Sequence, residues 1–278
     1  MNKLIRYPKK LLAACAIAAA ATCGSALAEP VFQVQEGAID GVMNLVTSDR
    51  LTFGYNSRII QTINGGSLVG ADDPFTQNGF LSKGSFELGA GNAEPSLLNA
   101  PEQLGGYGIY GIFQILGEAD PFGIGGILAT VNSVTMTLYA DRDQNTMLGF
   151  DGLNTVTRSN FGDDAALANF TMIAAEAHIF GGLANGDFDS FLNMTLTPFG
   201  ETYFVSPDPF YPIENFGGNI QTLTGVGLTS PNLTTSFVAQ ATGAGVELFQ
   251  IPEPGVLSLF GLAALAMGAA TRRQKKTA

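Results

Sequence analysis

The chain has 278 residues, with 24 acidic against 13 basic side chains and a formal net charge of −11 at pH 7. Both cysteines, Cys15 and Cys23, lie within the first 28 residues, which excludes a disulfide or a cysteine-based metal site from the rest. Between Glu29 and Pro254 only five cations face all 24 acids, a net charge of −19. Such a surface repels nucleic acid and anionic lipid, and it attracts divalent cations.

The first 28 residues have the three parts of a secretory signal peptide. Four cations within residues 3–10 precede an apolar run over residues 11–21. Ala26 and Ala28 form a small-x-small cleavage sequence. We expect signal peptidase to cut after Ala28, so that the mature chain begins at Glu29 beyond the inner membrane.

Short apolar runs separated by Gly, Asn, Asp and Pro predict many strands in the body of the chain. Residues 134–138 and 192–197 alternate apolar and polar side chains, which is typical of half-buried strands. Residues 106–116 are apolar on both faces and predict a central, doubly covered strand, with a buried helix as the alternative; residues 165–177 also suit a short helix. The expected strands are 50–55, 58–63, 79–88, 106–117, 127–140, 169–180, 190–198, 219–224, 234–241 and 245–250.

These segments predict an all-β fold, with one antiparallel β-sandwich or jelly roll over residues 29–250. A closed barrel is the alternative. The signal helix precedes this body, and a transmembrane helix follows it.

One loop of the body resembles a metal-binding sequence. Asp141, Asp143 and Asn145 match the first three ligand positions of a calcium loop. Position six is Thr146 rather than glycine and position twelve is not glutamate, which excludes an EF-hand. The residues predict a looser calcium site, with Asp151 as a further ligand, or else an Asp-rich turn; no other cofactor is expected.

The sequence offers few residues for catalysis. His178 is the only histidine, so neither a Cys-His pair nor a His-based zinc site can form within one chain. The Gly-x-Ser-x-Gly sequence of a hydrolase nucleophile is absent. Paired carboxylates remain open as a basis for glycoside hydrolysis. We therefore predict a protein that is not an enzyme, with a polysaccharide hydrolase as the weaker alternative.

The aromatic and proline-rich residues 203–211 have two interpretations. Their rings can stack on sugars, or they can form a rigid loop that plugs one end of the body. The first interpretation makes the chain a carbohydrate-binding module with a defined sugar site.

The last 27 residues, 252–278, contain three consecutive features. Pro252, Glu253 and Pro254 form a rigid extended tripeptide, because two prolines fix φ and remove two backbone donors. Residues 255–270 are uncharged and make roughly 24 Å of helix, slightly short of a bilayer core. Arg272 and Arg273 begin a basic tail that stays on the cytoplasmic side.

This arrangement, within residues 251–278, resembles the PEP-CTERM sorting signal of Gram-negative bacteria. The resemblance implies a transient anchor in the inner membrane, cleavage near residues 252–254 by exosortase, and release to the outer envelope or extracellular matrix.

Three stretches of the body, residues 105–113, 139–146 and 203–211, are similar in sequence and order to the PepA family of flocculation-associated PEP-CTERM proteins. That resemblance implies a secreted matrix or surface protein that acts with exopolysaccharide in cell aggregation and biofilm. It assigns no catalytic residue.

Overall fold

A computed structural model describes residues 31–41, 43–62, 72–89, 95–122, 126–152, 154–179, 186–210, 213–220, 222–224 and 236–250. The predicted signal peptide and sorting signal lie outside these residues. Among the residues that are described, no helix is long and apolar enough to cross a membrane.

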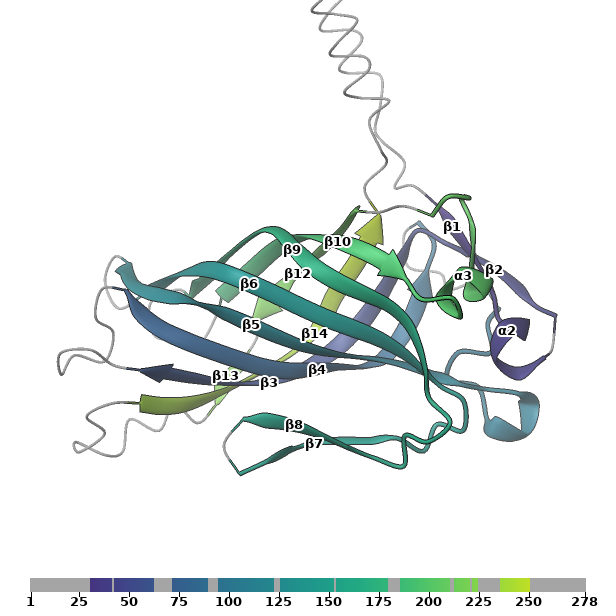
Figure 1. Cartoon of the computed structure of the whole chain (residues 1–278), viewed down its shortest axis with the longest axis horizontal. Helices are drawn as coiled ribbons and strands as arrows, with labels where there is room; N and C mark the ends of the chain where they lie inside the picture. Colours follow the sequence, from purple (N-terminus) through teal and green to yellow (C-terminus); the bar gives the residue numbers. More distant parts are fainter. Residues whose placement is uncertain are drawn as a thin grey trace, which may run out of the picture.

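The main body is one antiparallel sheet that closes on itself (Figure 1). Its strands are β3 (Arg50–Thr62), β4 (Asp73–Glu87), β5 (Gly108–Phe122), β6 (Gly126–Asp141), β9 (Ala165–Ile179), β10 (Gly186–Leu196), β12 (Ile213–Ile220), β13 (Thr222–Thr224) and β14 (Ser236–Gln250). Neighbours follow chain order from β3 to β12, and β14 pairs with both β3 and β12, which completes a barrel of eight strands. The ninth strand, β13, pairs with β14.

The predicted all-β, antiparallel character is confirmed, but the two-sheet sandwich is wrong and the alternative, a closed barrel, is what forms. The strands are longer than predicted: residues 50–55 and 58–63 belong to the single strand β3. Residues 165–177 are strand rather than helix. Strands of 11 to 16 residues with register shifts, such as the one between Leu116 and Gly117, bend enough to close one sheet, so a second sheet is not needed.

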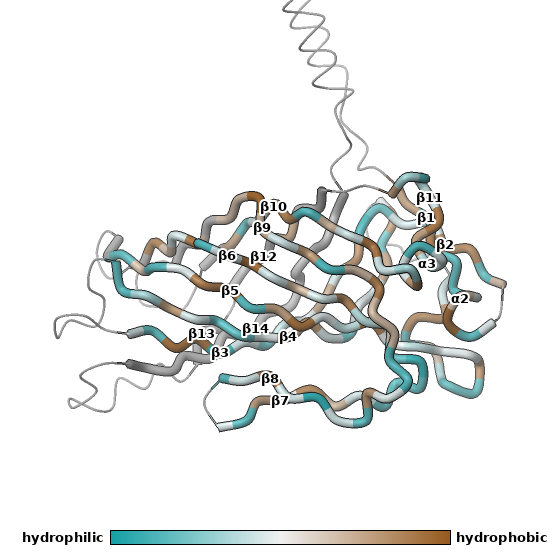
Figure 2. The backbone as a smooth tube through the Cα atoms, in the orientation of Figure 1, coloured by the Kyte–Doolittle hydropathy of each residue, from teal (hydrophilic) through white to brown (hydrophobic). Residues whose placement is uncertain are grey.

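Hydrophobic and hydrophilic residues alternate along the barrel strands (Figure 2). The side chains on one face of each strand are largely buried and those on the other are more exposed. In β6, Val134, Met136 and Leu138 are buried, whereas Thr135 is exposed and Thr137 half-buried, as predicted. The same pattern holds in β10, where Leu192 and Met194 are buried and the residues that follow each are exposed. This alternation places a large apolar core inside the ring, with a smaller separate cluster around Phe75.

Glycines make room for aromatic rings inside the barrel. A Cβ on Gly79 would lie 2.3 Å from the ring of Phe113, and a Cβ on Gly117 would lie 2.7 Å from the ring of Phe75. Because real Cβ atoms do not approach so closely, these rings occupy the space that the two glycines leave.

A small sheet closes one end of the barrel (Figure 1). Phe32 of this sheet packs against Phe86 of β4 and against Phe204 and Phe210, with ring centroids 6.2 to 6.3 Å apart. The stretch 203–210 therefore plugs a barrel end. The end sheet comprises β1 (Phe32–Gln35), β2 (Leu45–Ser48) and β11 (Phe204–Ser206), beside the short helices α2 (Gly37–Asp40), α3 (Gly200–Tyr203) and η1 (Glu102–Leu104).

Glu36 is the polar centre of this end. Its side chain is fully buried, and its carboxylate accepts hydrogen bonds from the Leu97 N–H (2.9 Å) and the Tyr107 hydroxyl (3.0 Å). Ser96 and Asn44 also donate to it. Several donors compensate for the loss of water, so the buried carboxylate fixes the end sheet to the loop before β5.

Two buried tyrosines inside the protein differ in their hydrogen bonding. The Tyr55 hydroxyl finds no hydrogen-bond partner among the described residues. The Tyr107 hydroxyl lies 2.6 Å from that of Tyr203 and 3.0 Å from Glu36. Burial raises the pKa of Tyr107 and of Tyr203 well above the ordinary value.

These contacts predict opposite effects for one chemical change. Tyr55→Phe should raise the free energy of unfolding by about 1 kcal/mol, because it removes an unsatisfied buried hydroxyl. The matched variant Tyr107→Phe should lower it by about 1 to 3 kcal/mol, because Glu36 and Tyr203 lose a partner. Urea unfolding at pH 7 measures both, and a loss of stability in Tyr55→Phe would contradict the prediction.

The Tyr55→Phe variant and the wild type should also differ in how their free energies of unfolding depend on pH. Burial raises the pKa of Tyr55 from 10.0 to about 12, so the unfolded chain ionises first and the folded state loses stability as the pH rises through this window. Tyr55→Phe removes that loss. Its stability advantage over the wild type should therefore widen between pH 10 and 12, and unfolding curves across this range measure it.

Candidate functional site

The chain leaves the barrel wall at the end of β14. Gln250 pairs with Glu214 of β12, and Phe249 pairs with Arg50 of β3, so one neighbour holds the strand at its last residue and the other at the residue before it. In the sequence, one residue separates Gln250 from Pro252. The proposed processing sequence thus begins next to the folded wall, at the end of the barrel that carries the end sheet.

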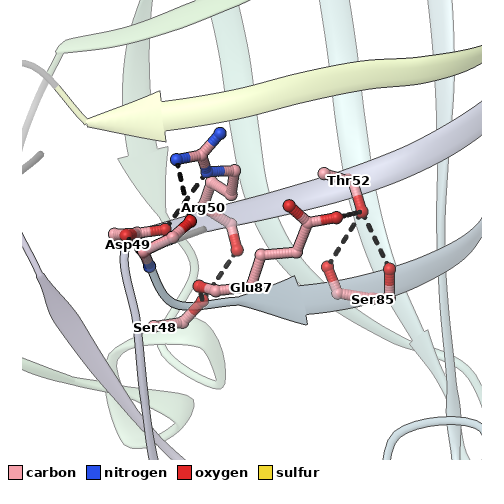
Figure 3. Close-up of polar contacts among 7 residues, drawn as sticks. Ser48, Asp49, Arg50, Thr52, Ser85 and Glu87 are labelled. Atoms are coloured by element: carbon pink, nitrogen blue, oxygen red, sulfur yellow. Dashed lines mark hydrogen bonds and ion pairs between the residues drawn. The ribbon is translucent and has the colours of Figure 1, made fainter. Parts of the chain in front are cut away.

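Polar contacts stiffen the wall beside this exit (Figure 3). The Ser48 hydroxyl donates to the carbonyl of Glu87, and the Asp49 carboxylate lies 3.2 Å from Nε of Arg50. Thr52 Oγ1 lies 2.8 Å from the Ser85 hydroxyl. These bonds join the end of β2 and the start of β3 to the end of β4, which fixes the position from which β14 exits.

A second polar site lies in the loops after β6 and before β9. One carboxylate oxygen from each of Asp141, Asp163 and Asp164 lies within 4.8 Å of the others. The Asp141 carboxylate accepts hydrogen bonds from the backbone N–H groups of Asn145 (3.2 Å) and Thr146 (3.0 Å). Burial raises the pKa of Asp141, these two hydrogen bonds lower it, and the charges of Asp164 and Asp163 raise it further.

The predicted calcium residues are only partly brought together. Asp143 contributes its backbone N–H to Asp163 (3.0 Å), and its own side chain is exposed, like that of Asn145. Asp151 lies at the far end of β7 (Met147–Asp151). The calcium site stays a prediction, and the carboxylates gathered here are those of Asp141, Asp163 and Asp164. Sequence reasoning missed Asp163 and Asp164, which lie about 20 residues further along.

The third site is a groove under a hairpin. The strands β7 and β8 (Thr155–Ser159) form this hairpin outside the barrel wall. Near its tip, the Phe150 ring packs on Phe80 with centroids 5.4 Å apart. Arg58 lies 4.7 Å from the centroid of Phe150 and donates to the Gly152 carbonyl (3.2 Å). These contacts hold the tip against β3 and β4.

The base of the hairpin is held by an arginine. Arg158 donates to the Tyr110 hydroxyl (3.0 Å) and lies 4.5 Å from the ring centroid of Tyr139. Tyr110 stacks on Tyr139 at 5.1 Å, and its hydroxyl donates to Asp164. Burial, followed by the bond to Asp164, raises the pKa of Tyr110.

Between these two attachments lies a groove of about 460 Å³. Gln114 donates to Asn78 across its floor (2.9 Å), and Ile112 and Val156 add apolar contacts. None of the residues that line it carries a charge. Its polar lining residues are Asn78, Gln114, Thr135, Thr137, Tyr139 and Thr155.

The side chains of the remaining candidates lie outside the described part of the structure. His178 lies in β9 and pairs with Asp187 of β10 and Leu128 of β6; its side chain lies outside the described part of the structure. Ala26 and Ala28, and the sorting residues Pro252, Glu253, Pro254, Arg272 and Arg273, also lie outside it.

Comparison with known proteins identifies one segment. Residues 250–274 match the family model described as the PEP-CTERM protein-sorting motif. No curated protein and no solved structure matches the chain. The match implies export to the cell surface with exosortase as the processing partner. It does not extend to the resemblance to the PepA family, which rests on the three body stretches.

A calcium site formed by Asp141, Asp163 and Asp164 can be distinguished by experiment from the loop of Asp141, Asp143 and Asn145 that the sequence predicts. We expect millimolar calcium to raise the melting temperature of the purified mature protein, because an ion would relieve the repulsion among three nearby carboxylates. Asp163→Asn should abolish this shift if the three carboxylates bind the ion. The control Asp143→Asn should preserve it, whereas loss in Asp143→Asn alone would favour the sequence-predicted loop. No shift in the wild type would remove the site.

Proposed function

We propose that the mature chain is a non-enzymatic component of the extracellular matrix that takes part in exopolysaccharide-dependent cell aggregation, as in flocs and biofilm. The sorting motif at residues 250–274 is the observation that carries this proposal. It directs the chain to the surface, and the matrix is the surface layer in which a protein without a catalytic centre can act by binding.

The position of the motif supports release of the folded body by cleavage. Because β14 ends at Gln250, before the proposed cut, cleavage near residues 252–254 would release the barrel without unpairing any of its described strands. The hydrogen bond between Ser48 and Glu87, beside the exit of β14, would stay intact within the released body. The cut thus separates a folded barrel from its anchor.

The charge of the body supports a role in a matrix. A net charge of −19 keeps copies of the chain apart, and divalent cations can bridge them to other acidic polymers. Many weak contacts of this kind hold an aggregate together through multivalency. Repulsion between bodies also favours contacts through polysaccharide over direct association.

The absence of enzyme activity is part of the proposal. The mature sequence contains one histidine and no cysteine, which excludes a Cys-His pair, and it lacks the Gly-x-Ser-x-Gly sequence of a hydrolase nucleophile. The carboxylate of Asp141 accepts two backbone N–H groups, and that of Asp164 accepts the Thr146 hydroxyl, as expected for residues that order loops. A polysaccharide hydrolase is the weaker alternative. A carbohydrate-binding role has support from the uncharged groove under the β7–β8 hairpin.

Deletion of the gene tests the proposal in cells. We expect the deletion strain to settle several-fold more slowly than its parent and to retain normal exopolysaccharide. The wild-type gene should restore settling. The variant P252A/P254A should not, because its folded body is not released.

A matched control keeps this result specific. Pro101→Ala changes an exposed proline outside the sorting motif and should restore settling like the wild type. Unchanged settling in the deletion strain would reject the aggregation role. Full rescue by P252A/P254A would reject the need for processing.

A further inference from the structure

The outer face of the barrel carries a straight row of uncharged polar side chains. Asn78, Gln114, Thr135, Thr171 and Asn193 are successive register partners across β4, β5, β6, β9 and β10. Neighbouring strands lie about 4.8 Å apart, so the row spans about 19 Å. All five side chains are half-buried or exposed.

A second, parallel row lies beside the first. Thr137, Asn169 and Thr195 are partners across β6, β9 and β10. The Thr137 hydroxyl donates to the Asn169 amide oxygen (3.0 Å), which leaves the Asn169 amide nitrogen as a donor. The two rows together form a regular surface of amides and hydroxyls, each able to donate and accept.

The groove under the β7–β8 hairpin lies at one end of this surface. Asn78, Gln114 and Thr135 of the first row line the groove, whereas Thr171 and Asn193 extend the row beyond it. The hairpin is held at its tip through Phe150 and at its base through Arg158. An extended molecule that lies along the row would therefore have one end under the hairpin and the rest on the open wall.

The charge of this surface points to a neutral ligand. The two rows and the groove lining contain no charged residue, although the mature chain has a net charge of −19. A cationic polymer would find no carboxylate in the rows, and an anionic one would be repelled by the body. A peptide strand would need a free sheet edge, but the strands under the rows are paired on both sides.

We propose that the two rows and the groove bind one neutral, extended polysaccharide chain, laid across the strands. Repeating hydroxyl groups of such a chain match the repeating amides and hydroxyls of the rows. The identification of this chain with the matrix polysaccharide rests on the proposed function, whereas the binding itself does not. Apolar contacts from Ile112 and Val156 supply the surface on which one sugar ring lies under the hairpin.

Calorimetry with linear hexasaccharides tests the site. The neutral probes are cellohexaose, xylohexaose and mannohexaose, and the charged comparators are a mannuronate hexamer and a glucosamine hexamer. We expect the purified mature protein to bind at least one neutral probe, with an affinity that changes less than about twofold between low and high salt, because no charge is neutralised.

Variants then locate the binding. Thr135→Val with Thr171→Val removes two hydroxyls but keeps the shape of both exposed strand residues, and it should weaken binding about tenfold or more. Gln114→Ala should weaken binding to a similar degree. The control Gln103→Ala changes an exposed glutamine in η1, outside both rows, and should leave the affinity within about twofold.

Several outcomes would overturn the proposal. These are no binding of any neutral probe, tighter binding of a charged hexamer, or equal affinity in the wild type and the double valine variant. Dimers in sedimentation that disappear in the double valine variant would assign the face to a second copy instead. Binding as predicted, together with normal settling of the deletion strain, would reject only the matrix role.

Discussion

The fold depends on β14, which has two tasks. It completes the barrel by pairing with β3 on one side and β12 on the other, and its last residue, Gln250, is also the first residue of the sorting motif. The first long strand of the barrel therefore cannot gain its second neighbour until the chain is complete up to the motif. Among the described residues, β3, β12 and β14 each have neighbours on both sides, which limits edge-to-edge association of an exported, disulfide-free body.

This constraint divides the surface into two regions. The end with the β1–β2–β11 sheet lies beside the exit of β14, where Ser48, Asp49 and Glu87 hold three strands together and Glu36 fixes the sheet from within. The outer wall of β4 to β10 carries the uncharged rows and the groove. The exit toward the sorting motif and the proposed polysaccharide surface thus lie on different parts of the barrel, so that binding at one would not block the other.

The sequence predicted the parts of the chain whose signal is local. The alternation in residues 134–138 predicted which face of β6 is exposed to solvent. The order of prolines, apolar run and cations identified the sorting motif. The sequence could not decide between a closed barrel and a sandwich. Alternation shows which face of a strand is exposed to solvent, but it does not show which strands lie next to it. Asn56 and Ser57 suggested a break between two short strands, yet Ser57 points into the barrel within β3.

The candidate sites show the same division between local and distant signals. Asp141 was identified from its own loop, but Asp163 and Asp164 reach it from a loop beyond the hairpin. Asn78, Gln114 and Thr135 are far apart in the chain and form a row only through strand pairing. The alternating residues 134–138 and 192–197 were the sequence signals that pointed to this surface, because Thr135, Thr137, Asn193 and Thr195 all belong to the rows.

The most direct test is mass spectrometry of the protein recovered from outside the cells. The account predicts that its C-terminus lies close to residues 252–254, so that an intact β14 remains and Arg272 and Arg273 are missing. Recovery of an extracellular chain that still ends in residues 271–278 would contradict it.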